Sequence, residues 1–205
     1  MIADMDSTII ENECIDELAD AIGVGDVVSD ITERAMRGEL EFESALIERV
    51  ALLEGLSEAD LQKVYDDRIR LTPGAAEMVS ALTDQGVTCV LVSGGFTFFT
   101  SRVAEAAGFV ANHANELEVK DGRLTGRVVM PILGADAKLA TMHDYVSKLG
   151  IGMDEVMAIG DGANDIPMIS AAGMGVAFCP KPVTAEAADH VINTRDLREV
   201  LKLFA

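Results

Sequence analysis

The stretch that decides the fold is VTCVLVSGG, which runs from Val87 to Gly95. Residues 87–92 form a continuous apolar run, which is typical of a strand that is buried on both faces of a sheet. A serine and two glycines follow, and apolar residues then recur at helical spacing from about Phe96 to Ala107. A buried strand that leads through a short turn into a helix predicts one βα unit of a parallel sheet.

Strands and helices alternate on both sides of this unit. Before it, a helix is predicted from Pro73 to Gly86. After it, the segment from Leu117 to Val129 alternates around Asp121-Gly122 and predicts a β-hairpin with a tight turn. We therefore expect an α/β fold: a Rossmann-like, doubly wound parallel sheet with a β-hairpin flap, whose ligands bind beyond the C-terminal ends of the strands. The remaining predicted elements are a helix at 136–149, a strand at 155–159, a helix at 164–172, a strand at 174–178 and a strand and helix at 190–204.

A different pattern near the N-terminus predicts a helical insertion after the first strand. Met1 to Ala3 read as that strand, and from Glu13 to about Arg70 apolar residues recur almost only at helical spacing. Three residues are few for a buried strand, so an upstream regulatory domain outside this sequence is a further expectation. We expect two parts: a core formed by residues 1–12 and 71–205, and a helical cap formed by residues 13–70.

The charge balance limits the partners that the protein can have. The 205 residues include 16 basic and 35 acidic side chains, a net charge of −19, and this charge repels nucleic acids and anionic membranes. It also repels a phosphorylated small molecule, so a phosphate site needs local compensation from a metal ion, a few cations or helix N-termini. We expect a small-molecule substrate, a monomer or homodimer, and no nucleic-acid or membrane partner.

The cysteines and the hydropathy bear on the compartment. Three cysteines lie far apart and form no CxxC pair (Cys14, Cys89, Cys179), which favours reduced thiols over a disulfide framework or a zinc site. No apolar run reaches the ~18–20 residues of a membrane-spanning helix. The start of the sequence also lacks the basic and apolar regions of a secretion signal. These features predict a cytoplasmic protein.

Carboxylates follow two of the predicted strands, at the point where each strand ends. Asp4 and Asp6 are two residues apart in DMDST, a spacing that puts both on one face of an extended chain. Asp161 and Asp165 lie in GDGAND, after another apolar strand. An isolated Asp-x-Asp pair is most often a solvated turn, but two acidic strand ends can bring oxygen ligands to one point. Such a ligand set favours Mg²⁺.

Donors for a phosphoryl group are the second requirement, and the sequence offers two candidates. Ser93 and Gly94 can supply a hydroxyl and backbone N–H groups at a helix N-terminus. Lys138, near the start of its own predicted helix, can supply a fixed positive charge. Each of these residues alone reads more simply as part of a turn or as an exposed lysine.

Taken in order, DMDST, Ser93, Lys138 and GDGAND resemble the four motifs of the haloacid dehalogenase-like phosphatases over essentially the whole chain. The resemblance implies that Asp4 attacks phosphorus and that Asp6 protonates the leaving alkoxide and later activates water. It also implies that Mg²⁺ is held by Asp4, the backbone carbonyl of Asp6 and Asp161. Asp165 would orient Lys138 or a water on the metal ion. Independently, an alkoxide leaves poorly, so an adjacent acid and covalent capture by a carboxylate suit this chemistry.

The predicted cap resembles that of the phosphoserine phosphatase branch of this family, beginning with ENECIDELAD at residues 11–20. The resemblance implies that Glu13 meets the ammonium group of the substrate and Arg49 its carboxylate. Met36 and Phe42 would shield the site from water, and Asn164 would contact the substrate or its phosphate. Arginine suits a carboxylate because its fork of donors binds both oxygens. Individually, Glu13 and Arg49 also read as an ordinary first-turn acid and a surface ion-pair partner, and the other two cap residues as core.

The expected activity is therefore hydrolysis of O-phospho-L-serine to serine and phosphate through an aspartyl-phosphate intermediate, the last step of serine biosynthesis. One alternative on the same scaffold is a phosphotransferase that passes the phosphoryl group to an acceptor such as homoserine. A second is a phosphate-sensing module without catalysis. The presence of Asp4, Asp6, Lys138 and Asp161 together argues against the second alternative.

Overall fold

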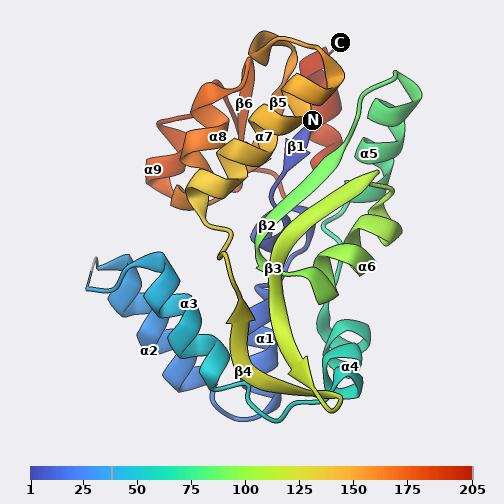
Figure 1. Cartoon of the computed structure of the whole chain (residues 1–205). Helices are drawn as coiled ribbons and strands as arrows, with labels where there is room; N and C mark the ends of the chain where they lie inside the picture. The colour runs from blue at the N-terminus through green and yellow to red at the C-terminus, as the bar shows by residue number, and fades with distance from the viewer. Residues whose placement is uncertain (38, 205) are drawn as a thin grey trace.

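Within residues 1–37 and 39–204, which the computed structural model describes, seven strands form one sheet in the order β4-β3-β2-β1-β5-β6-β7 (Figure 1). Every neighbouring pair is parallel except β3 and β4, which form the predicted antiparallel hairpin. The turn residues Asp121 and Gly122 both have positive φ angles, 51° and 74°, as a tight primed turn requires. The strands are β1 (Ile2–Ala3), β2 (Val90–Phe96), β3 (Ala111–Lys120), β4 (Arg123–Val129), β5 (Met157–Gly160), β6 (Met174–Phe178) and β7 (His190–Ile192).

Helices cover both faces of the sheet, which confirms the predicted doubly wound architecture. Along β2, Leu91 packs in the apolar cluster shared with α5, α6 and η4, whereas Val90 and Val92 pack in the cluster shared with α7 and α8. This alternation explains why the strand is a continuous apolar run, since both of its faces are buried. The helices are α5 (Ala75–Asp84), α6 (Thr97–Ala107), α7 (Ala135–Leu149), α8 (Ile166–Ala171), α9 (Pro182–Ala185) and the 3₁₀ helices η2 (Met153–Glu155), η3 (Ala163–Asp165) and η4 (Leu197–Phe204).

Between β1 and α5 the chain forms the predicted helical insertion, which lies at the end of the molecule away from both termini (Figure 1). The last of its helices begins at Ser57, where the Ser57 N–H donates to Asp60 Oδ2 at 2.9 Å and the Asp60 N–H donates to Ser57 Oγ at 3.2 Å. This reciprocal pair is a capping box, which fixes where the helix begins. The four helices are α1 (Cys14–Ala21), α2 (Gly25–Met36), α3 (Phe42–Ala51) and α4 (Glu58–Arg68).

The insertion is attached to the core in two places. The linkers that enter and leave it are paired, because the Glu11 N–H donates to the Arg70 carbonyl at 2.9 Å. The β3–β4 hairpin also extends down to the insertion (Figure 1), where the Leu124 N–H donates to the Leu56 carbonyl at 2.8 Å and its carbonyl accepts from the Gly55 N–H at 2.9 Å. The division into a core and a cap that acts as a separate domain stays a prediction.

Two local predictions were wrong. Strand β2 does not end at Val92 but continues to Phe96, because its pairing with β3 resumes there after an irregularity. Ser93 and Gly94 therefore belong to the strand end, and the helix begins only at Thr97. Strand β1 ends at Ala3, and residues 5–9 form a wide turn in which Asp6 (φ −67°, ψ 137°) and Ser7 (φ 55°, ψ −1°) are not helical, so Asp4 and Asp6 are not related by the pleat of a strand.

No helix in the described part of the chain is long and apolar enough to cross a membrane. The predicted compartment is not tested by this observation and stays a prediction.

Candidate active site

A cavity of about 710 Å³ lies between the C-terminal ends of the central strands and the insertion. Most of the residues that the sequence singled out line it, from segments far apart in the chain. The core contributes Asp4, Asp6, Ser93, Gly94, Asp161 and Asn164, and the insertion contributes Glu13, Phe42 and Arg49. The side chain of Met36 lies outside the described part of the chain. The ends of β1, β2 and β5 and the helical insertion thus converge on one site.

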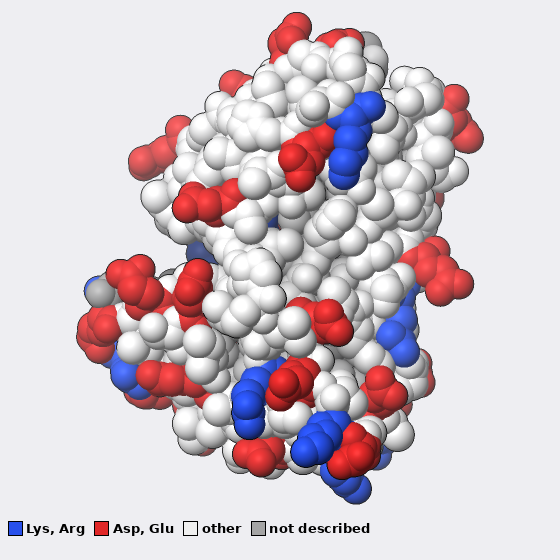
Figure 2. Space-filling model, viewed as in Figure 1, with Lys and Arg blue, Asp and Glu red and all other residues white. Residues whose placement is uncertain are grey.

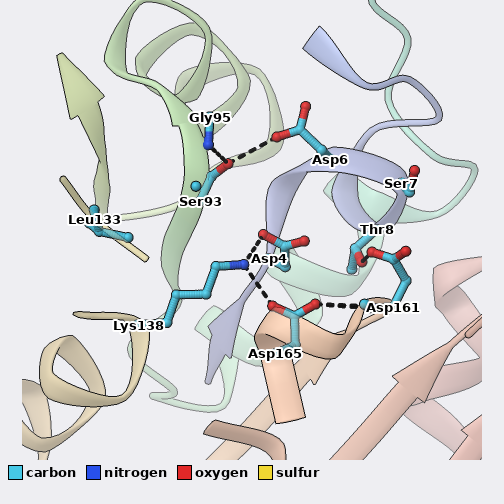
Figure 3. Close-up of polar contacts among 12 residues, drawn as sticks. Asp4, Asp6, Ser7, Thr8, Ser93, Gly95, Leu133, Lys138, Asp161 and Asp165 are labelled. Atoms are coloured by element: carbon cyan, nitrogen blue, oxygen red, sulfur yellow. Dashed lines mark hydrogen bonds and ion pairs between the residues drawn. The ribbon is translucent and has the colours of Figure 1, made fainter. Parts of the chain in front are cut away.

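A buried triad lies at the floor of this site (Figure 3). Lys138 Nζ donates to Asp4 Oδ1 and to Asp165 Oδ1, both at 2.6 Å. Asp165 Oδ2 accepts from the backbone N–H groups of Asp161 and Gly162, at 3.2 and 3.0 Å. Both oxygens of Asp165 are therefore engaged within the protein, and this carboxylate fixes the lysine and the turn that carries Asp161.

The charges at the floor of the site favour binding of a divalent cation. Burial and the nearby Asp165 carboxylate raise the pKa of Asp4 well above its ordinary value, against the opposing effect of Lys138. Burial and Asp165 likewise raise the pKa of Asp161 to about 6. Burial lowers the pKa of Lys138, but Asp4 and Asp165 outweigh it and hold that pKa above its ordinary value. Three buried carboxylates against one ammonium leave two unbalanced negative charges.

The donor set at this floor fits a hard metal ion. One oxygen atom from each of Asp4, Asp161 and Asp165 lies within 4.8 Å of the others, and oxygen ligands of this kind suit Mg²⁺ or a similar divalent ion. Asp161 Oδ1 also accepts from Thr8 Oγ1 at 3.3 Å, which orients it toward Asp4. Since the oxygens of Asp165 are engaged elsewhere, Asp4 and Asp161 are the carboxylates best placed to hold the ion.

Asp6 is held on the opposite side of the site from Lys138 (Figure 3). Ser93 Oγ donates to Asp6 Oδ2 at 2.9 Å, and the Cys14 N–H donates to Asp6 Oδ1 at 2.8 Å. The Gly95 N–H in turn donates to Ser93 Oγ at 2.8 Å. A methyl group at Gly95 would lie 2.9 Å from Asp6 Oδ2, so glycine is required for this approach. The arrangement orients one carboxyl group toward the cavity next to Asp4, as an acid–base residue requires.

The insertion places one carboxyl group, that of Glu13, and one guanidinium, that of Arg49, in the cavity wall. Ser7 Oγ donates to Glu13 Oε1 at 2.6 Å. Arg49 Nε donates to the Ala45 carbonyl at 3.2 Å, and its Nη1 donates to Thr32 Oγ1 at 3.3 Å. Among the described residues, no carboxylate lies within 4.0 Å of the Arg49 guanidinium, so it does not form the surface ion pair that was the simpler interpretation of this residue. Its remaining N–H groups are available to a ligand.

Phe42 lies over the mouth of the site and contacts the core. A methyl group at Gly94 would come within 3.2 Å of the Phe42 ring, and one at Gly134 within 3.4 Å. The aromatic ring therefore packs against two backbone positions that have no side chain. With 36% of its surface still exposed, Phe42 occupies the place expected of a residue that limits access of water.

Three polar side chains of the cavity lining were missed by the sequence reasoning: Asp16, Thr32 and Lys181. Thr32 accepts a hydrogen bond from Arg49, and the helical spacing of the sequence does not predict that contact. Lys181 follows the end of β6, so its place after a parallel strand is a signal that could have identified it.

Comparisons with known proteins agree with this geometry. Residues 1–170 match the family model of the haloacid dehalogenase-like hydrolases. A phosphoserine phosphatase from Streptococcus thermophilus is 46% identical over 203 residues, covering 99% of this chain and 94% of that protein. One from Archaeoglobus fulgidus is 48% identical over 206 residues, and the match covers 99% of this chain but only 60% of the length of that protein.

The fold is also found among solved structures. A phosphoserine phosphatase with a phospho-aspartyl intermediate analogue superposes with a TM-score of 0.91 at 42% sequence identity. The superposition covers 98% of this chain and 96% of the other. The similarity therefore includes the insertion as well as the sheet.

Proposed function

Because the chain belongs to the haloacid dehalogenase-like hydrolase family, we propose that it hydrolyses O-phospho-L-serine to serine and phosphate with Asp4 as the nucleophile. The observation that carries this proposal is the convergence, in one cavity, of the Asp4–Lys138–Asp165 triad at its floor with Glu13 and with Arg49, which forms no ion pair with a described carboxylate. The core residues suit a phosphate ester in general. The two residues from the insertion suit the carboxylate and the ammonium of an amino acid.

In the first step, a carboxylate oxygen of Asp4 attacks phosphorus and forms the P–O bond of an aspartyl phosphate. The bond between phosphorus and the serine oxygen breaks, and the leaving oxygen takes a proton from Asp6. Asp6 accepts hydrogen bonds from Ser93 Oγ and from the Cys14 N–H, and these hold it in the site. Lys138 stays buried against Asp4, and its hydrogen bond to Oδ1 keeps the Asp4 carboxylate in place.

In the second step, Asp6 removes a proton from water, which attacks phosphorus and breaks its bond to Asp4. Phosphate leaves, Asp4 is ionised again, and Asp6 holds the proton it needs for the next cycle. Mg²⁺, held by Asp4, Asp161 and the backbone carbonyl of Asp6, would supply the charge that keeps Asp4 ionised and neutralises the phosphoryl oxygens. Asn164 and Gly94 line the same cavity and complete our proposed set of substrate-binding residues together with Glu13, Phe42, Arg49 and Ser93.

The test of this proposal is release of inorganic phosphate from L-phosphoserine by the purified chain, with Mg²⁺ and after its removal by a chelator. We expect turnover that needs the metal ion and no second substrate. Turnover that appears only when an acceptor such as homoserine is added would contradict hydrolysis and indicate a phosphotransferase. A lack of any phosphate release would contradict an enzymatic role.

Arg49→Ala is expected to raise KM for phosphoserine by about 10- to 100-fold, because it removes charge-assisted hydrogen bonds that contribute roughly 1.5–3 kcal/mol. For an aryl phosphate, which has no carboxylate, KM should change by no more than about threefold. Steady-state kinetics on both substrates checks this expectation. Arg49→Lys, which keeps the charge and loses the fork, is the matched control and should fall between the two. Equal losses on both substrates would show that Arg49 does not bind the carboxylate.

Glu13→Gln is expected to stabilise the metal-free protein at alkaline pH while it weakens phosphoserine turnover. Burial by the cavity walls and the Asp6 carboxylate raise the pKa of Glu13 from 4.5 to about 8. The folded state thus keeps a proton that the unfolded chain releases, and stability falls as pH rises from 4.5 toward 8. The glutamine variant lacks this cost. Because Glu13 is exposed at the cavity wall, solvent screens its charge, and we expect a gain of only a few degrees in Tm.

The measurement for Glu13→Gln is thermal unfolding of both proteins near pH 5 and near pH 8.5. The Tm difference should be small at the lower pH and favour the variant at the higher one. A difference that is constant with pH would contradict the raised pKa.

A further inference from the structure

The charges around the cavity are unevenly distributed. The basic side chains in its lining are Arg49 and Lys181. The acidic ones are more numerous: Asp4, Asp6, Glu13, Asp16 and Asp161. Lys138, below the floor, is 1% exposed and engaged by two carboxylates. In the function proposed above, Arg49 binds the carboxylate of the substrate. Among the described residues that line the cavity, Lys181 is therefore the one further cation that an entering phosphate dianion can meet.

The backbone of Lys181 is fixed although its side chain is exposed. The residue lies in the turn between β6 and α9, where its N–H donates to the Asp161 carbonyl at 3.1 Å. Its own carbonyl accepts from the N–H groups of Thr184 and Ala185, at 3.0 and 3.2 Å. The preceding turn is also restrained, since the Cys179 N–H donates to the Ile192 carbonyl at 2.7 Å. The lysine stem therefore begins from a defined point beside Asp161.

The charge of Lys181 lies in the wall of the site and is not paired. Lys181 belongs to the lining of the cavity together with Asp161 and Asn164, so its side chain reaches the wall of the proposed reaction site. Within the described residues, no carboxylate is found within 4.0 Å of its Nζ. Figure 2 shows acidic side chains gathered over the insertion and a hollow between it and the core. A free cation beside that hollow is placed to attract an anion into it.

We propose that Lys181 is a substrate-binding residue that draws in the phosphate group and contacts it at the open side of the site, opposite Lys138. The inference rests on the proposed phosphatase function, but it concerns the phosphate rather than the serine part of the substrate. Lys181 therefore serves any phosphate monoester that the site accepts, whereas Arg49 serves only those with a carboxylate.

The test compares Lys181→Met and Lys181→Arg with Lys120→Met, which removes the same charge from an exposed position on the hairpin. For Lys181→Met we expect KM to rise about tenfold for both phosphoserine and p-nitrophenyl phosphate, with kcat changed less than about twofold. The Kd of inorganic phosphate, measured by calorimetry with Mg²⁺ present, should rise by the same factor. The dependence of kcat/KM on salt should weaken. Lys181→Arg should restore most of the loss, and Lys120→Met should behave as the parent protein.

Several outcomes would overturn the inference. These are an unchanged Kd for phosphate, an effect no larger than that of Lys120→Met, and a loss confined to phosphoserine. A change in Mg²⁺ affinity with no change in phosphate affinity would also overturn it, because Lys181 would then act only on the metal ligands. If the parent protein hydrolyses the aryl phosphate but not phosphoserine, the proposed substrate fails, while the aryl phosphate and calorimetric measurements still decide the role of Lys181.

Discussion

Asp4→Asn is expected to lower kcat at least about 10⁴-fold for both phosphoserine and an aryl phosphate, because the amide oxygen is too weak a nucleophile to capture the phosphoryl group. The substitution preserves size and an acceptor for Lys138, so folding should survive. In the metal-free protein Tm should be unchanged or higher, since burial and Asp165 make an ionised Asp4 costly. Kinetics on the two substrates and thermal unfolding check these expectations.

The matched control for Asp4→Asn is Asp84→Asn, the same change at an exposed position at the end of α5. It should leave kcat unaltered. Turnover by Asp4→Asn close to that of the parent would contradict the covalent mechanism as a whole. Loss of activity accompanied by unfolding would be seen in the Tm, and kinetics should then be repeated with Asp4→Glu, which keeps the charge and displaces the nucleophile.

Lys138→Met is expected to cost about 3–5 kcal/mol of stability, because it leaves the buried Asp4 and Asp165 carboxylates without a partner. For a chain of this size, that corresponds to a fall of roughly 10 °C in Tm. Activity should fall by several orders of magnitude as well, since the nucleophile loses the contact that fixes it. Lys138→Arg should not restore the parent, because the lysine is 1% exposed and leaves no space for a planar fork.

The loss in Lys138→Met should depend on pH in a defined direction. Without the ammonium, nothing opposes the burial that raises the pKa of Asp4, so the folded state holds a proton on Asp4 that the unfolded chain releases above about pH 4. Stability relative to the parent should therefore fall further as pH rises from about 5 to 8. Denaturant unfolding at both pH values measures this difference, with Lys120→Met as the control for a lost surface charge. A loss that is independent of pH would show that the triad is not held by charge.

Much of the fold followed from local patterns because those patterns record which side of each element is buried. The continuous apolar run at residues 87–92 reflects a strand covered by α5 and α6 on one face and α7 and α8 on the other. Asp121-Gly122 fixed the hairpin because both residues adopt positive φ angles. Ser57 and Asp60 fixed the start of α4 by capping it. For the hairpin and for α4 the physical cause lies within a few residues of the signal, whereas the strand is buried by helices far along the chain.

The candidate site was predicted less completely. The motifs predicted that Asp4, Lys138 and Asp165 lie at one edge of the sheet, since parallel strands end at the same edge, and Lys138 does donate to both carboxylates. They did not explain how Asp6 is placed. The prediction attributed the position of Asp6 to the pleat of a strand. Its position instead results from the wide turn at residues 5–9 and from the hydrogen bonds that Ser93 and Cys14 donate to the Asp6 carboxylate.

By itself, the sequence determined the alternation of strands and helices, the position of the insertion and the residue types that serve phosphoryl transfer. Only the tertiary structure decided which of those side chains meet. Lys138 contacts Asp4 across 134 positions of sequence, and Arg49 depends on Thr32 in a neighbouring helix. Lys181 reaches the site because its turn is bonded to Asp161. Periodicity reports only whether a residue is buried, whereas such contacts depend on the path of the whole chain across the sheet.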